Sequence, residues 1–244
     1  VSFKNIKDDS LQINPGTKDN SDSGYRSRYS HQTEEAYPGY YKVRLEDENV
    51  LAELTTTERV GFHKYTFPKT DSAHIILDLT SGIYNYDGKV VWSSIRVEND
   101  TLVTGYRQTN GWARTRLLYF AMTFSEPIQN YGLVNKEELI YKGFWRKFNQ
   151  NKNFPEQAGN EIVSYFDFKT EDGEAILIKF ALSAVSTKNA VENLNAEIPQ
   201  WDFEKIKSQA KQKWNDELSK ITIKADDDRK VNFYTSMYHS FMNP

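Results

Sequence analysis

The sequence contains no cysteine among its 244 residues, which excludes disulfide bonds, thiolate nucleophiles and zinc–thiolate sites together. It has no run of about 18 apolar residues, so we expect no segment that spans a membrane. The net charge is only −3, which argues against a nucleic-acid-binding protein that relies on a basic face. What remains is a chain long enough for one large domain or two smaller ones, with a sizeable core.

A secretory signal is also missing from the start of the chain. Residues 1–4 (VSFK) have no apolar segment behind a basic start. The chain begins with Val1 rather than methionine, so we expect it to be a piece of a longer protein from which any export signal has been cut away.

Aromatic residues are abundant, with 14 Phe, 15 Tyr and 5 Trp, and they occur in short runs of alternating polarity. That alternation is the period of half-buried strands, and turn residues such as Asn110-Gly111 separate the runs. The sequence therefore predicts a mainly β protein, a large antiparallel sandwich of two sheets. The predicted strands cover residues 40–46, 50–57, 60–67, 74–79, 90–97, 101–107, 112–123, 162–168 and 175–185.

The pattern breaks between residues 126 and 161, where a weak alternation over 136–149 is compatible with another strand pair. The C-terminal third changes to a helical period. We expect a helix over 188–198, a second from Asp202 as N-cap to about Lys220, with Trp201 and Ile206 as a hydrophobic staple, and a short returning strand over 221–224. An apolar helix then opens after the acidic stretch 226–228.

The stretch SRYSHQTEEAYPGYYKV, residues 27–43, combines a histidine, two glutamates and four tyrosines before a strand. Pro38-Gly39 is the chemistry of a type II turn, because proline presets φ and glycine accepts a positive φ. Glu34 and Glu35 are neighbours, so on an extended chain they point apart and cannot flank one bond as a catalytic pair.

No other motif supplies a catalytic or metal site. The four histidines lack metal-ligand spacing, and residues 226–228 (DDD) lack the alternating acids and glycine of a calcium loop. A nucleophile elbow, a phosphate-binding loop and a dinucleotide fingerprint are all absent. We predict no catalytic residue, metal ligand or cofactor in this chain.

Aromatic and planar polar side chains remain as candidate recognition groups. Aromatic faces stack on the C–H faces of sugars, while arginine and histidine donate hydrogen bonds to hydroxyls. The alternative is that these aromatics pack in the core and the arginines form incidental ion pairs. The candidates for a substrate rim or a domain interface are Arg26, Arg28, His31, Glu34 and Trp112.

Several long segments resemble the N-terminal domain of glycoside hydrolase family 92, the bacterial exo-acting α-mannosidases. They are GYRSRYSHQTEEAYPGYYKVRL, ELTTTERVGFHKYTFP, VTGYRQTNGWA, LYFAMTFSEPI, EIPQWDFEKIKSQAKQKWNDELSKI and FYTSMYHSFMNP, and the resemblance weakens at residues 1–13 and 126–160. It implies a β-supersandwich of the galactose-mutarotase-like type over 1–197, a linking helix and strand over 198–225, and the start of an absent (α/α)₆ barrel over 226–244.

The resemblance also implies an activity: removal of terminal α-linked, often 1,2-linked, mannose from glycans, by inversion and with calcium in the full-length enzyme. It implies a periplasmic or secreted location. The barrel carries the family's carboxylates, so we expect this chain to be inactive alone, with the catalytic domain and mannose-containing glycans as its partners. The alternative hypothesis is an autonomous carbohydrate-binding sandwich.

Overall fold

The computed structural model describes residues 15–16, 24–82, 86–136 and 155–242. Its strands are β1 (Glu35–Tyr37), β2 (Tyr40–Leu45), β3 (Val50–Thr56), β4 (Val60–Thr66), β5 (Thr70–Asp78), β6 (Val90–Val97), β7 (Leu102–Thr109), β8 (Arg116–Phe124), β9 (Asn130–Asn135), β10 (Glu156–Gly159), β11 (Ile162–Thr170) and β12 (Ala175–Ser183). Its helices are the short η1 (His31–Thr33), α1 (Thr187–Glu197), α2 (Phe203–Leu218) and α3 (Asp227–Met242).

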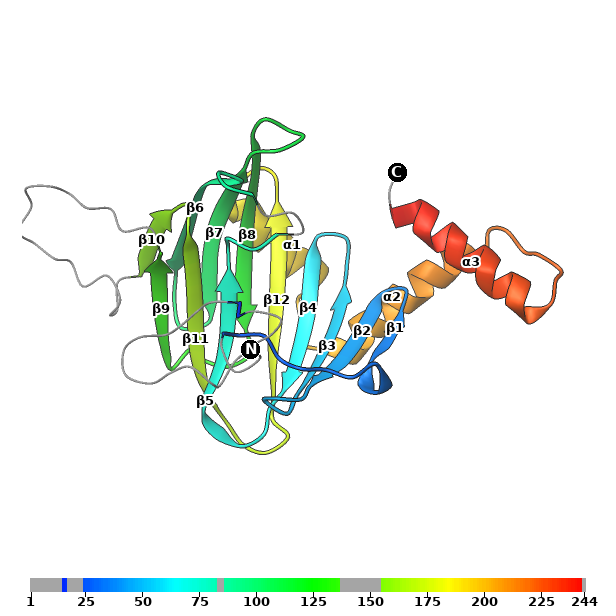
Figure 1. Cartoon of the computed structure of the whole chain (residues 1–244), viewed down its shortest axis with the longest axis horizontal. Helices are drawn as coiled ribbons and strands as arrows, with labels where there is room; N and C mark the ends of the chain where they lie inside the picture. Colours follow the sequence, from blue (N-terminus) through cyan, green and yellow to red (C-terminus); the bar gives the residue numbers. More distant parts are fainter. Residues whose placement is uncertain (1–14, 17–23, 83–85, 137–154, 243–244) are drawn as a thin grey trace, which may run out of the picture.

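Within these ranges the strands form two antiparallel sheets, one of nine strands in the order β1-β2-β3-β4-β12-β8-β7-β6-β10 and one of three in the order β5-β11-β9 (Figure 1). The predicted mainly β sandwich of two antiparallel sheets is therefore confirmed. A core of phenylalanines and aliphatic residues fills the space between the sheets. Phe124 on the large sheet, for example, lies 5.1–5.2 Å from Phe166 and Phe168 on the small one, measured between ring centroids.

All nine predicted strands are present, although β5 begins four residues earlier than predicted, at Thr70, and β8 begins four residues later than predicted, at Arg116. Thr109 pairs with Arg116, so a six-residue loop (110–115), not a two-residue turn at Asn110-Gly111, joins β7 to β8. Three further strands, β1, β9 and β10, were not predicted. β1 and β10 have only three and four residues, whereas β9 has six and contributes Leu133 to the core; each pairs with a neighbouring strand. The strand pair suggested for 136–149 lies almost wholly outside the described residues.

The predicted helices at 188–198 and 203–220 correspond to α1 and α2. Ser186 and Asp202 cap them, each accepting a hydrogen bond from the backbone three residues later. Both helices lie on the face of the large sheet that is turned away from β5, β9 and β11 (Figure 1). Buried residues of the helices form a second apolar cluster there with Val60, Phe62 and Ala181. The molecule thus has three layers in which the large sheet is the middle one.

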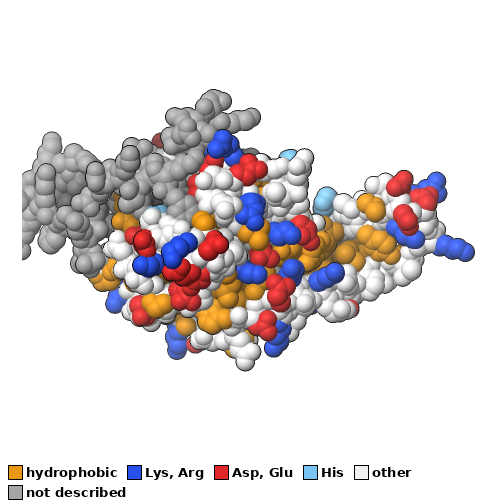
Figure 2. Space-filling view, turned by 90° about the horizontal axis from the view of Figure 1, so that it is seen from below, with side chains coloured by type: hydrophobic (Ala, Val, Ile, Leu, Met, Phe, Trp, Pro, Cys, Tyr) orange, Lys and Arg blue, Asp and Glu red, His pale blue; other side chains and the backbone are white. Residues whose placement is uncertain are grey.

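The predicted returning strand at 221–224 is wrong, because these residues form neither strand nor helix. They join α2 to α3 on a helical arm that projects away from the sheets, where no strand edge is within reach to pair with them (Figure 1). The arm carries hydrophobic side chains on its surface (Figure 2), including Val231, Phe241 and Met242. Trp214 of α2 meets Tyr238 of α3 with ring centroids 4.8 Å apart.

Candidate functional site

The predicted Pro38-Gly39 turn is present and joins β1 to β2. Tyr37 pairs with Tyr40 across it, and Gly39 has φ +86°, the left-handed value that glycine accepts without strain. The turn lies against α2, since a Cβ atom added to Gly39 would come within 2.9 Å of Ala210 Cβ. The aromatic segment thus ends against α2 and not in open solvent.

His31 and Glu34 come together upstream of this turn. Glu34 Oε2 lies 2.6 Å from His31 Nδ1, and Glu34 Oε1 accepts a hydrogen bond of 2.7 Å from the Tyr41 hydroxyl. The bond from Tyr41, and then the contact with His31, lower the pKa of Glu34, while the same bond raises the pKa of Tyr41 to about 12. Glu34 is therefore an ionised acceptor near neutral pH, which does not suit a general acid.

The adjacent Glu35 has a different partner, the Lys42 ammonium at 2.5 Å. Tyr41 and Lys42 point to opposite faces of β2, so the two glutamates diverge as the sequence predicted. They cannot serve as the acid and base of a glycosidase across one glycosidic bond.

The two arginines of this region differ. Arg28 donates from Nε to Asp47 Oδ1 at 2.6 Å, and its backbone N–H donates to the other carboxylate oxygen at 3.0 Å. These bonds attach the segment before η1 to the turn between β2 and β3. Arg26 is exposed. Nearby, the Tyr25 hydroxyl donates to Asp78 on β5 at 2.8 Å, a tie that the sequence did not suggest.

Trp112 lies apart from the other candidates. It is fully exposed in the loop between β7 and β8, at the top of the sandwich in Figure 1, whereas η1 lies at the lower right beside β1. The structure therefore brings His31 and Glu34 together, with Arg28 on the same segment, but does not bring Trp112 to them. Their roles toward a sugar or a partner domain stay predictions.

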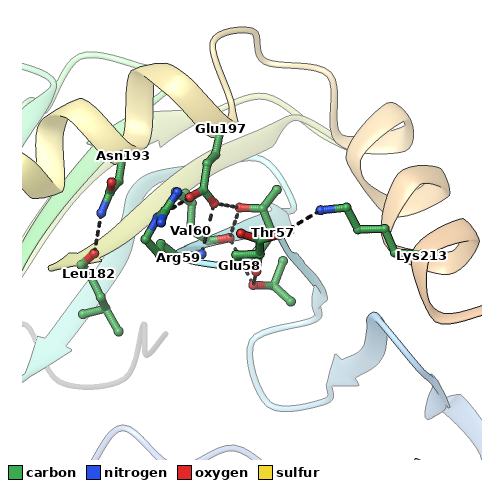
Figure 3. Close-up of polar contacts among 9 residues, drawn as sticks. Thr57, Glu58, Arg59, Val60, Leu182, Asn193, Glu197 and Lys213 are labelled. Carbon is green, nitrogen blue, oxygen red and sulfur yellow. Dashed lines mark hydrogen bonds and ion pairs between the residues drawn. The ribbon is translucent and has the colours of Figure 1, made fainter. Parts of the chain in front are cut away.

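A connection that the sequence did not reveal joins the end of α1 to the turn between β3 and β4 (Figure 3). Glu197 Oε2 accepts from the Thr57 hydroxyl at 2.6 Å and from the Arg59 backbone at 3.0 Å, and its Oε1 accepts from Arg59 Nε at 2.6 Å. Burial by itself would raise the pKa of Glu197, but these bonds outweigh burial and lower it. The carboxylate ties the end of α1 to the large sheet.

Lysine–aromatic contacts continue this attachment along α2. Lys207 Nζ lies 4.0 Å from the centre of the Tyr40 ring, and Lys211 Nζ lies 5.5 Å from that of Tyr37. Lys64 of β4 reaches back to the Phe203 ring at 5.4 Å. Phe203 and Lys207 lie in the first half of α2, which also buries the apolar residues of this helix, and Lys211 adds a contact just after that half.

The segment between α1 and α2 is held in the same way. Trp201 lies over Lys179 of β12, with 3.9 Å between Nζ and the ring centre, and its centroid lies 6.1 Å from that of Phe62. Burial lowers the pKa of Lys179 to about 8. These contacts give Trp201 partners on the sheet, whereas the staple with Ile206 stays a prediction.

Substituting Glu197→Gln tests the lock on α1. We expect the free energy of unfolding at pH 7 to fall by about 1–2 kcal/mol, allowing for the partial exposure of Arg59. Because the folded pKa of Glu197 is lowered, its stabilising effect is present above the unfolded pKa and is lost as the pH falls through the folded value. Urea unfolding at pH 7 and near pH 3 should show the difference from the wild type shrinking in acid.

The matched control is Glu192→Gln, which changes an exposed glutamate of the same helix and should alter stability by less than about 0.5 kcal/mol. An equal loss in both variants, or a difference that persists unchanged in acid, contradicts the proposed lock.

In the part of the chain that the structure describes, no three His, Asp or Glu side chains lie together as a metal site would require. His63 and His74 lie within strands, as predicted. Burial lowers the pKa of His63 to about 4, and His74 Nδ1 is 2.6 Å from Asp167 Oδ1. The burial of His63 and the contact of His74 with Asp167 are typical of histidines with a structural role. The helices described are all too short or too polar to cross a membrane.

Comparison with solved structures places this arrangement among glycosidases. The α-mannosidase BT3965 from Bacteroides thetaiotaomicron is 35% identical, matches 94% of this chain and 30% of its own, and superposes with a TM-score of 0.83. The inverting mannosidase BT2199 from the same species is 27% identical, matches 87% of this chain and 27% of its own, and gives a TM-score of 0.73.

A curated relative, described as an uncharacterized secreted glycosidase of Arthroderma benhamiae, is 24% identical over 237 residues, which is 88% of this chain and 29% of that protein. The chain thus spans less than a third of the length of these relatives. Residues 8–183 match the model of the glycosyl hydrolase family 92 N-terminal domain, and residues 189–244 match that of the family 92 catalytic domain. The chain therefore belongs to glycosyl hydrolase family 92.

Proposed function

We propose that this chain is the N-terminal part of an α-mannosidase that removes terminal α-linked, specifically 1,2-linked, mannose from glycans. The main support is the 35% identity to the α-mannosidase BT3965 across 94% of the chain. BT3965 has also been solved in complex with mannoimidazole, which favours a mannose-containing substrate for this chain as well.

The role proposed for the sandwich is to support and cap a helical catalytic barrel. Residues 1–197 would be the sandwich, 198–225 the linker and 226–244 the start of the barrel. Two observations support this. The Glu197 bonds tie the end of α1 to the sheet, directly before the proposed linker, and the lysine–aromatic contacts tie α2 to it. The α3 arm leaves Val231, Phe241 and Met242 exposed for a partner to cover.

Inversion is the proposed stereochemical course, and the description of BT2199 as an inverting mannosidase supports it. An inverting enzyme needs one carboxylic acid to protonate the leaving oxygen and a carboxylate about 6.5–9.5 Å away to activate water. Glu34 and Glu35 are unsuitable because they diverge toward separate partners. We therefore assign the acid and the base to the catalytic domain and not to this sandwich.

Calcium is assigned to the catalytic domain for the same reason, since the described residues contain no cluster of ligands for it. A bound calcium ion would supply oxygen coordination for sugar hydroxyls. A periplasmic or secreted location is proposed, supported by the secreted relative from Arthroderma benhamiae.

The five candidate residues would line the substrate rim or the interface with the barrel. Arg28 and Glu34 already bind Asp47 and Tyr41, so their proposed part is to hold the segment in shape. Arg26 and Trp112 are exposed and would make the contacts themselves.

The proposal is tested by assaying an aryl α-mannoside and an α-1,2-linked mannobiose with this chain alone and with the chain extended through a complete catalytic domain. We expect no turnover above the blank for the chain alone and hydrolysis by the extended protein, with inversion at the anomeric carbon visible by NMR. Hydrolysis by the chain alone, or an extended protein that cleaves other glycosides but no mannoside, contradicts it.

A further inference from the structure

An aromatic patch lies on the large sheet, outside every site described above. Thr104 and Ala121 are paired on β7 and β8, and Ala121 is buried on the face covered by α1. Tyr106 and Tyr119 are the next pair on that same face, since side chains alternate along a strand. Their ring centroids are 5.8 Å apart, and both residues are partly exposed.

Strand β6 extends this patch. Ser94 pairs with Tyr106, and Trp92, two residues earlier, pairs with Gln108 on the same face. Trp92 is 40% exposed, which is far more than the exposure of residues in the core. Trp92, Tyr106 and Tyr119 therefore form a diagonal row across three neighbouring strands, a span of roughly 10 Å. We call this row, with Gln108 and Ser94, the aromatic platform.

The platform carries no charge, although 27% of the residues in the chain are charged. The two cross-strand rows that contain it are Trp92–Gln108–Leu117 and Ser94–Tyr106–Tyr119. Within β6, β7 and β8 the first charged residue on the same face is Arg96, which is paired with Glu98 at 3.3 Å and with Glu156 at 3.5 Å. A neutral ligand would meet no desolvated charge here.

The polar atoms of the aromatic platform are also available to bind a ligand. Among the described residues, no hydrogen bond or ion pair engages the hydroxyls of Tyr106 and Tyr119 or the amide of Gln108. Exposed aromatic faces beside unengaged hydroxyl and amide groups are the combination that stacks on sugar rings and bonds to their hydroxyls. A protein interface of ordinary size would need about 800 Å² per partner, which is far more area than three side chains on a row of roughly 10 Å provide.

We propose that the aromatic platform binds a neutral glycan chain by stacking, at a second site separate from the catalytic pocket. Such a site would hold the polymer to which the cleaved sugars belong. The choice of α-mannan as the first probe rests on the proposed function, whereas the platform itself is argued from the geometry of β6, β7 and β8.

The test is affinity electrophoresis of the 244-residue chain in gels containing yeast α-mannan or a soluble β-glucan, followed by titration calorimetry with the retarding polymer. We expect retardation by at least one polymer. The double variant Trp92→Ala/Tyr106→Ala should lose roughly tenfold or more in affinity, because two ring contacts are removed. Tyr106→Phe, which keeps the ring, should bind nearly as well as the wild type.

Phe241→Ala on the distant α3 arm is the matched control and should leave binding unchanged. Circular dichroism and thermal unfolding would verify that each variant is folded. The proposal is overturned if neither polymer retards the wild type, if Trp112→Ala abolishes binding while the platform variants do not, or if the platform variants change self-association and not glycan binding.

These outcomes are distinguishable from failure of the proposed function. Retardation by the β-glucan alone would support the platform while counting against a mannan-directed enzyme. Mannoside hydrolysis by the extended protein, without retardation of this chain by either polymer, would support the proposed function and contradict glycan binding at the platform.

Discussion

Phe62→Ala is expected to lower the free energy of unfolding by about 4 kcal/mol, the cost of a large cavity in a core that cannot collapse. Phe62 is completely buried on β4 and lies between the sheet and the linker. Its ring centroid is 5.3 Å from that of Phe203 and 6.1 Å from that of Trp201. Truncation should therefore loosen the linker as well as the sheet, and urea unfolding with limited proteolysis around residues 198–202 would measure both effects.

Phe62→Leu keeps most of the side-chain volume and should cost less than about 2 kcal/mol. Phe241→Ala removes the same group from an exposed position on α3 and should change stability by no more than about 0.5 kcal/mol. If Phe62→Ala were as mild as Phe241→Ala, the joint between sheet and linker could not be packed as described.

Gly39→Ala is expected to destabilise the protein by about 3 kcal/mol through two separate effects. The first is backbone strain, because Gly39 has φ +86°, which costs a residue with a Cβ about 1–2 kcal/mol. The second is a collision with α2, since the new Cβ would lie 2.9 Å from Ala210 Cβ and 3.3 Å from Trp214 Cδ1. Urea unfolding would give the total loss.

Gly88→Ala separates the two effects. Gly88 has a similar φ of +76°, but a Cβ there would meet nothing within 4 Å. It should therefore cost only the strain, about 1 kcal/mol. Equal losses at Gly39 and Gly88 would indicate that α2 does not press on the β1–β2 turn, and the tight seating of the linker would have to be abandoned.

The fold could be predicted from the sequence where a strand is long enough to show the alternation of apolar and polar residues. Alternation marked the nine longer strands, and Asp202 with the apolar spacing after it marked α2. Strand β1, with three residues, and β10 (EQAG) have too few apolar positions to show a period, and they exist because a neighbour pairs with them. The residues at 221–224 have a strand-like pattern but no partner edge.

The candidate site was less predictable. The sequence suggested Arg28, His31 and Glu34 because they lie close to several tyrosines, and in the structure they bind partners within the sandwich. It did not suggest Glu197, whose partner Arg59 is 138 positions away. Nothing in the sequence around a glutamate in the last turn of a helix shows whether its side chain is solvated or bound to a residue far along the chain.

The sequence by itself determined the strand periods, the turn at Pro38-Gly39, the helix starts and the absence of thiol chemistry, since each depends on residues within a few positions of one another. Only the tertiary structure decided that α1 and α2 pack on the large sheet and that Trp92, Tyr106 and Tyr119 form one row. The physical reason is that strand register and helix docking are set by the packing of side chains distant in the chain. No local pattern of residues encodes such long-range contacts.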